Sequence, residues 1–308
     1  MMKTTISVLA LCAASPVFAQ ANCDLVRFSD VGWTDITSTT AATSIVLNAL
    51  GYQTSTDILS VPVTYASMAE GDIDVFLGNW MPTMEGDIAT YRDAGTVDTV
   101  RTNLEGAKYT LATNAAGVAA GITDFASIAA AATALDGKIY GIEAGNDGNR
   151  LISDMIAADA FGLKDFEIVE SSEQGMLAQV ERADERNEPV IFLGWEPHPM
   201  NANFKMTYLP GGDDWFGPNL GGATVATNTR AGYVTDCPNT GKLLANLGFS
   251  LEMENQIMGS ILNDGMDPDA AAKQWLAAHT EAWTPWLEGV TTKDGGDAVA
   301  AVTAALAM

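Results

Sequence analysis

The sequence predicts an α/β protein of about two domains. Short apolar runs alternate along the chain with stretches of helical periodicity, a pattern typical of strands and helices packed in layers. Of the 308 residues, 47% are hydrophobic and 18% are charged, as in a folded protein with a large core. Because a single core stops growing at roughly 250 to 300 residues, this length favours two domains.

The first strand and helix follow one another near the start of the predicted mature chain. Residues 24–28 form a short apolar run that predicts a strand. Residues 37–50 predict a helix, because their apolar positions fall on one face, a Thr or Ser caps the start, and Gly51 follows the last turn.

The rest of the chain continues this alternation. Buried strands are expected where four or five apolar residues occur together, and helices where apolar residues recur at helical spacing. In chain order, the expected elements are strands over 73–77 and 110–114, an Ala-rich helix over 122–135, a strand over 138–142, a helix over 149–161, a strand over 166–169, a helix over 174–187 and a strand over 190–193. After residue 221 helices dominate, notably over 240–247, 252–264 and 268–288.

The first 21 residues have the features of a secretory signal peptide. Lys3 makes the start positive, residues 6–14 are apolar but shorter than the ~20 residues that span a bilayer, and residues 17–21 offer small-residue cleavage sites. Lipidation of Cys12 is the disfavoured alternative, because Leu11 stands where a small residue is needed. No later apolar stretch reaches membrane-spanning length, so we expect the mature chain in the periplasm.

Removal of this segment leaves two cysteines, Cys23 and Cys237. An even number in an oxidising compartment favours a disulfide, with two buried free thiols as the alternative. Such a bond ties the start of the mature chain to its last quarter. The two ends of the chain are then expected in one lobe and the middle in the other.

The charge balance excludes some classes of partner. The chain has 15 Lys and Arg against 39 Asp and Glu, a formal net charge of -24. Phosphate binding depends on clustered Lys and Arg, so nucleic acid is excluded as a partner. An anionic membrane surface is disfavoured for the same reason.

Three tryptophans stand next to glycines where predicted strands end. They lie in V-G-W-T-D at 31–35, G-N-W-M-P at 78–82 and G-W-E-P-H-P at 194–199. Ligands of open α/β sheets bind beyond the carboxyl ends of the strands, so Trp33, Trp80 and Trp195 predict an aromatic-walled site. Core packing is the alternative for each ring. We favour core packing for Trp275, Trp283 and Trp286, which lie at helical spacing. For Trp215 the sequence does not decide between core packing and a place in the site.

Recognisable catalytic motifs are lacking. The two histidines, His198 and His279, cannot form a H-E-x-x-H or His-rich metal site, and no G-x-S-x-G occurs. The Gly-Lys pair at 241–242 is followed by Leu, where a phosphate-binding loop needs Ser or Thr. A pair of catalytic carboxylates stays open as an alternative. We therefore expect a protein that is not an enzyme and has no metal and no cofactor.

Together, the three tryptophan motifs resemble the substrate-binding proteins of bacterial ABC importers for quaternary amines, the glycine betaine and choline group. The resemblance extends from residue 22 to about residue 287. It implies a type II periplasmic binding fold, in which two α/β lobes joined by two crossing strands enclose a ligand cleft. We expect lobe one over 22–110 and 219–308, and lobe two over 111–218.

Within this group the sequence is most similar to the choline-binding branch. The resemblance implies that Trp33, Trp80, Tyr109 and Trp195 enclose a trimethylammonium group, that Asp35 neutralises it and that Asn146 bonds the choline hydroxyl. The bridging disulfide of this branch likewise falls on Cys23 and Cys237. From the residues alone, Asp35 could instead cap a helix, Asn146 could occupy a left-handed turn and Tyr109 could belong to the core. We interpret His198 as a supporting residue.

The expected function is capture of choline, with acetylcholine also accepted, and delivery by hinge closure of a monomer to an ABC permease. Choline is favoured over glycine betaine because Asp35 repels a ligand carboxylate, and because Lys108, Arg150 and Lys205 have no assignable role at the site. The alternatives are uptake of glycine betaine or proline betaine, a chemoreceptor-linked sensor, and a hydrolase of choline esters or phosphocholine.

Overall fold

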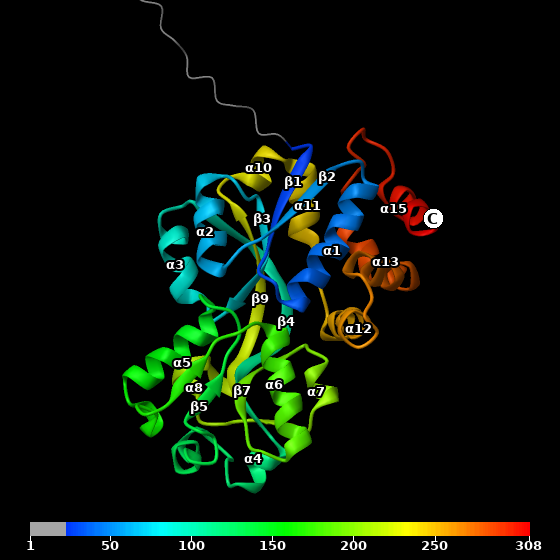
Figure 1. The fold of residues 1–308 in the computed structure, drawn as a ribbon. Helices are drawn as coiled ribbons and strands as arrows, with labels where there is room; N and C mark the ends of the chain where they lie inside the picture. The colour runs from blue at the N-terminus through cyan, green and yellow to red at the C-terminus, as the bar shows by residue number, and fades with distance from the viewer. Residues whose placement is uncertain (1–22) are drawn as a thin grey trace, which may run out of the picture.

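The computed structural model describes residues 23–308, which form two α/β lobes joined by two long strands (Figure 1). The strands follow the order β2-β1-β3-β9-β4-β7-β5-β6, and β8 pairs with β4. The signal peptide predicted over 1–21 lies outside the described residues. Among residues 23–308, no helix combines the length and the apolar character needed to cross a bilayer.

The first lobe is built on three parallel strands, β1 (Leu25–Asp30), β2 (Gln53–Ile58) and β3 (Val75–Met81). The helices in this part of the chain are α1 (Thr34–Ala49), α2 (Val61–Glu70) and α3 (Glu85–Asp93). The C-terminal segment packs on the same lobe and contributes α10 (Tyr233–Asp236), α11 (Pro238–Asn246), α12 (Leu251–Leu262), α13 (Pro268–Ala278), α14 (Thr280–Trp283), η4 (Thr284–Leu287) and α15 (Ala298–Leu306).

Two strands carry the chain between the lobes. β4 (Val97–Asn114) and β9 (Gly222–Arg230) pair antiparallel, and both run from one lobe toward the other in Figure 1. β9 also pairs with β3 in the first lobe, whereas β4 pairs with β7 in the second. The expected lobe boundaries, 110/111 and 218/219, fall near the end of β4 and inside α9 (Pro218–Gly221), and the assignment of residues to lobes stays a prediction.

The second lobe extends the sheet beyond β4. Its strands are β7 (Ile191–Glu196), β5 (Lys138–Tyr140) and β6 (Glu167–Val169), with β8 (Met206–Tyr208) antiparallel to β4. Its helices are α4 (Ala115–Ala119), η1 (Phe125–Ser127), η2 (Ala129–Ala131), α5 (Asp147–Ala157), η3 (Ala160–Gly162), α6 (Glu173–Arg186), α7 (Met200–Asn203) and α8 (Asp213–Phe216).

Side-chain caps fix where several helices begin. Asn146, Ser172 and Ser250 each accept a hydrogen bond from the backbone N–H three residues ahead, at the starts of α5, α6 and α12. α2 ends at Gly71, whose φ of 82° places it in the left-handed region that glycine adopts without strain. The helices that approach the cleft therefore start at defined residues.

The predicted disulfide is present. Cys23 bonds Cys237 with a Cα–Cα distance of 5.4 Å across 214 positions of sequence. The bond joins the segment before β1 to the start of α11, and Cys237 belongs to an apolar core that also contains Phe28 and Trp286. The N-terminal and C-terminal segments thus share one core, as the cysteine count led us to expect.

The Ala-rich helix expected over 122–135 is wrong. The segment forms two short 3-10 turns, η1 and η2. Asp124 and Ser127 cap each other around the first turn, with the Ser127 N–H donating to Asp124 Oδ1 at 2.8 Å. Alanine side chains offer little apolar surface to hold a helix against the lobe, so the packing of buried Phe125 and Ile128 decides the local path.

The single helix expected over 268–288 is also wrong. Its periodicity is real, but the helix ends at His279, whose φ of -128° and ψ of 59° are not helical. A short α14 and the 3-10 helix η4 follow, with Pro285 at the start of η4. Trp283 and Trp286 are nevertheless buried, so the packing role predicted for them is confirmed.

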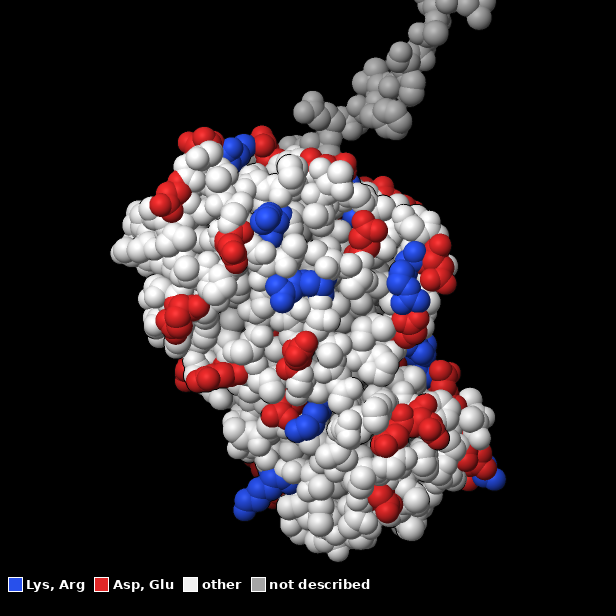
Figure 2. Space-filling view, turned by 180° about the vertical axis from the view of Figure 1, so that it is seen from behind, with Lys and Arg blue, Asp and Glu red and all other residues white. Residues whose placement is uncertain are grey.

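Charged side chains are spread over the surface. On the face shown in Figure 2, Asp and Glu occur on both lobes, with Lys and Arg interspersed among them. The acids on this face are dispersed and form no single patch, while the net charge of -24 gives the chain as a whole a negative field. Such a field attracts small cations, and salt weakens it.

Candidate functional site

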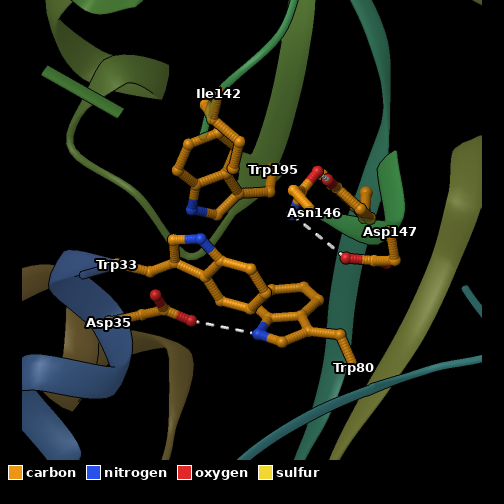
Figure 3. Close-up of a pocket in the computed structure, with 8 residues that line it drawn as sticks. Trp33, Asp35, Trp80, Ile142, Asn146, Asp147 and Trp195 are labelled. Carbon is orange, nitrogen blue, oxygen red and sulfur yellow. Dashed lines mark hydrogen bonds between the residues drawn. The ribbon is translucent and has the colours of Figure 1, made fainter. Parts of the chain in front are cut away.

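A small pocket lies where residues from both lobes meet. Little free space remains between its walls, so the pocket suits a compact molecule. The structure brings all six predicted ligand-binding residues to this pocket, and their role in binding stays a prediction. The lining residues are Trp33, Asp35, Trp80, Tyr109, Ile142, Asn146, Asp147 and Trp195 (Figure 3).

Four aromatic residues from four elements form the walls. Trp33 immediately precedes α1, Trp80 lies in β3, and Tyr109 in β4 pairs directly with Trp195 in β7. The Tyr109 ring centroid lies 6.0 Å from that of Trp80 and 6.4 Å from that of Trp195. All four side chains are buried, so core packing and pocket lining are not exclusive here.

The polar edges of three rings are fixed by hydrogen bonds. Trp33 Nε1 donates to Glu143 at 2.6 Å, and Trp80 Nε1 donates to Asp35 Oδ2 at 3.1 Å. The Tyr109 hydroxyl donates to Asn146 Oδ1 at 3.0 Å. Because these edges are already paired, the chemistry that the rings offer to the pocket is that of their faces.

Asp35 is a buried acid inside the first turn of α1. The residue that caps α1 is Trp33, so the alternative that Asp35 caps this helix is wrong. Its Oδ1 has no hydrogen-bond partner among residues 23–308, and its side chain is almost fully buried. Burial, and next the negative charge of Glu173, raise the pKa of Asp35 to about 8. A cation in the pocket would relieve both costs.

Asn146 caps α5 and holds its neighbours in place. Its Oδ1 accepts the Tyr109 hydroxyl and the Asn149 N–H at 3.0 Å each, and its Nδ2 donates to Asp147 Oδ1 at 3.1 Å. With a φ of -70°, it does not occupy the left-handed turn that was the alternative. One N–H of the amide remains available.

Sequence reasoning missed Asp147 and Ile142. Asp147 is buried, its Oδ2 has no hydrogen-bond partner within the described chain, and burial raises its pKa to about 7. Figure 3 shows the Asn146–Asp147 pair on one side of the indole rings and Asp35 on the other. An acid in the first turn of a helix is usually solvated, so the sequence gives little reason to place Asp147 in a binding site. Its position next to Asn146 was the only signal.

The basic residues near the pocket are engaged elsewhere. Lys108 pairs with Glu196 at 2.7 Å, and Arg150 pairs with Asp87 at 3.0 Å and also donates to the Thr83 carbonyl. No Lys or Arg of residues 23–308 lines the pocket. Its charged groups are therefore acids alone, which favours a ligand with positive charge.

A family model for the substrate-binding domain of ABC-type glycine betaine transport systems matches residues 24–278. The chain belongs to this family of substrate-binding domains. Its members are transport proteins that bind a solute outside an importer, and the two-lobed α/β fold with a cleft is the one expected from the sequence.

Two solved structures and one curated relative are similar to this chain. An ABC-transporter choline-binding protein in complex with choline is 68% identical, covers 92% of this chain and 98% of its own, and superposes with a TM-score of 0.91. An ABC-transporter choline-binding protein in an unliganded semi-closed conformation is 67% identical and has a TM-score of 0.86. The match covers 94% of this chain and 100% of that chain. An uncharacterised protein of Chromohalobacter salexigens is 50% identical over 150 residues, which is 48% of this chain and 97% of that protein.

His198 supports the pocket of this family member without lining it. Its ring lies 4.9 Å from that of Trp195 by centroid, and its Nε2 is 3.2 Å from Glu173 Oε1. Trp215, undecided from the sequence, is half-buried in α8 and does not line the pocket. Trp275 stacks on His279 on the first lobe, away from the pocket.

Proposed function

We propose that this substrate-binding domain captures choline between its lobes in the periplasm and presents it to the permease of an ABC importer. One observation carries the proposal: four aromatic rings and two buried acids surround the pocket, and no Lys or Arg within residues 23–308 lines it. The choline complex of a protein 68% identical to this chain supports the same ligand.

The cationic end of choline suits the aromatic walls. A quaternary ammonium group has no N–H donor, so ring faces and negative charge must hold it, at ~0.5 to 2 kcal/mol per ring. Trp33, Trp80, Tyr109 and Trp195 supply four faces, and Asp35 supplies the charge. Together these contributions reach the range of micromolar binding, which requires about -8 kcal/mol.

The hydroxyl end suits the Asn146–Asp147 pair. A ligand hydroxyl donates one hydrogen bond and accepts others. The remaining N–H of Asn146 donates to its oxygen, and the unpartnered Oδ2 of Asp147 accepts its proton. With the ammonium group among the rings near Asp35 and the hydroxyl toward the Asn146–Asp147 pair, choline uses both features of the pocket.

Glycine betaine is the second candidate, because the family model is that of glycine betaine transport. Its carboxylate needs N–H donors or a cationic side chain, yet it would meet the acids Asp35 and Asp147. Lys108 and Arg150 are paired with Glu196 and Asp87. We therefore infer weaker binding of betaine than of choline.

Delivery follows from closure of the lobes. We assign Trp33, Asp35 and Trp80 to lobe one, Asn146 and Trp195 to lobe two, and Tyr109 to a crossing strand, with lobe one over 22–110 and 219–308. A ligand that contacts both sides favours the closed state by its differential affinity. A monomer suffices for this cycle, and the disulfide is consistent with an oxidising compartment.

The test is a calorimetric titration of refolded protein with choline and then with glycine betaine. We expect choline to bind at least about tenfold tighter, a difference of about 1.4 kcal/mol. Asp35→Asn should weaken choline more than betaine, whereas Asp264→Asn, which changes an exposed acid, should alter neither. Tighter binding of betaine would refute the roles given to Asp35 and Asn146, and binding of neither would refute the ligand.

A further inference from the structure

The start of α1 is capped by a residue from the other side of the cleft. The first N–H groups of a helix lack partners within it, and the side chain of the N-cap residue Trp33 makes no capping bond. Instead, the Thr34 N–H donates to Glu173 Oε2 at 2.9 Å, and the Thr34 hydroxyl donates to Oε1. Glu173 is the first residue of α6, which packs in the second lobe.

Glu173 is buried without a cationic partner in the described chain. Its side chain has 0% exposure, and its third hydrogen bond involves His198. The Met200 N–H donates to His198 Nδ1 at 3.0 Å, so the ring proton sits on Nε2 and is donated to Glu173. A carboxyl buried in this way is costly unless all of its donors are in place. Thr34 supplies two of the three.

This bridge reaches the pocket walls without entering the pocket. Thr34 lies between Trp33 and Asp35, and His198 packs against Trp195. Thr34, Glu173 and His198 themselves are not among the lining residues. The bridge therefore ties the wall segments of the two lobes to each other independently of any ligand.

Other contacts across the cleft are of a different kind. Trp33 bonds Glu143, but Trp33 is itself a pocket wall. Arg150 pairs with Asp87 while its own side chain is 38% exposed. The Arg150–Asp87 pair is therefore only partly shielded from water, with Asp87 12% exposed, whereas the Glu173 bonds are fully shielded.

We propose that the Glu173–Thr34 pair is a closing latch, in which lobe two caps helix α1 of lobe one and thereby holds the closed state. Opening the lobes breaks these bonds and returns Glu173 to water. Glu173 and Thr34 are thus positioning residues that set the population of the closed state. The latch predicts a longer residence time of choline, and this consequence rests on the proposed function. Its effect on the population of the closed state does not depend on which ligand binds.

The first test measures choline release by stopped-flow tryptophan fluorescence in four proteins: wild type, Thr34→Val, Glu173→Ala and the double variant. Thr34→Val keeps shape and backbone N–H but removes the hydroxyl donor. We expect Glu173→Ala to speed dissociation about tenfold or more and to change association less than about threefold. Thr34→Val should have a smaller effect that vanishes in the Glu173→Ala background. Arg150→Gln, which breaks the partly exposed pair with Asp87, is the matched control and should change release less than Glu173→Ala does.

The second test needs no ligand and separates the latch from the proposed function. Small-angle scattering of the ligand-free proteins should show a larger radius of gyration for Glu173→Ala, and a smaller increase for Thr34→Val, than for wild type. If wild type binds no choline, the ligand proposal fails and scattering alone judges the latch. Equal scattering for all four proteins would overturn it, as would strictly additive effects of the two substitutions on release.

Discussion

Asp35 is the residue whose charge we propose decides what the pocket accepts. It is buried, one of its oxygens has no hydrogen-bond partner within residues 23–308, and its pKa is raised to about 8 by burial and by Glu173. At neutral pH the carboxyl is therefore mostly protonated in the ligand-free closed form. Because a bound cation favours the ionised form, choline must displace the proton as it binds.

This coupling predicts that choline affinity rises with pH. The free protein binds the proton more tightly than the complex does, so between about pH 6 and about pH 8 each unit of pH increases the association constant by up to about tenfold. Isothermal titration across this range measures the slope. In Asp35→Asn the slope should become smaller, leaving contributions from the other buried acids near the pocket whose pKa is raised, such as Asp147 at about 7 and Glu143. A flat profile for wild type would contradict the role of Asp35.

At the residue scale, the sequence predicts the walls better than the polar groups. The tryptophans are marked by their repeated place beside Gly, and Tyr109, Asp35 and Asn146 come from the family motifs. No sequence feature identifies Asp147 in this way, because the burial of a first-turn acid depends on which residues of the other lobe and of β4 pack against it. Its importance is visible only once the fold brings Tyr109 and Asn146 to the same point.

At the scale of elements, the close packing of α5 on β4 positions the Tyr109 ring. Gly148 is the second residue of α5, and a Cβ atom there would lie 2.1 Å from the Tyr109 hydroxyl oxygen and 2.7 Å from Cζ. Such contacts are far inside van der Waals distance. Only glycine leaves room for the hydroxyl to reach Asn146.

Gly148→Ala is therefore expected to push the Tyr109 ring out of place and to weaken choline binding. The loss of one ring contact, ~0.5 to 2 kcal/mol, corresponds to about twofold to thirtyfold in the dissociation constant. Gly259→Ala in α12 is the matched control, since a Cβ there meets nothing within 4 Å. It should leave affinity unchanged and stabilise its helix slightly. Equal affinities of wild type and Gly148→Ala would show that the ring position is not constrained as described.

Elements with a strong apolar run or a cap are predicted well, and the others are not. Residues 174–187 match α6 to within a residue at each end, because Ser172 and Asn187 mark its limits. By contrast, only the last five residues of β4 were predicted. The pairing of its first half with β9 shifts register at several points, which breaks the alternation of polar and apolar residues. β9 is rich in Thr and Ala and has no apolar run.

At the scale of the whole molecule, the pocket exists because two lobes meet. Trp33 bonds Glu143, Thr34 bonds Glu173 and Arg150 bonds Asp87 across the cleft, over 63 to 139 positions of sequence. No local sequence pattern predicts such pairs, since each partner alone resembles an ordinary surface or capping residue. The two-lobed fold itself was predictable, because the tryptophan motifs resemble a family whose model matches residues 24–278.

The central claim is that the pocket recognises the positive charge of a quaternary ammonium group. The most direct test compares choline with its neutral carbon analogue, in which a carbon atom replaces the ammonium nitrogen while shape and hydroxyl are kept. Four ring faces at ~0.5 to 2 kcal/mol each, together with Asp35, predict that choline binds at least about a hundredfold tighter in isothermal titration. Equal affinity for the two ligands would mean that shape alone fills the pocket, and would contradict the account.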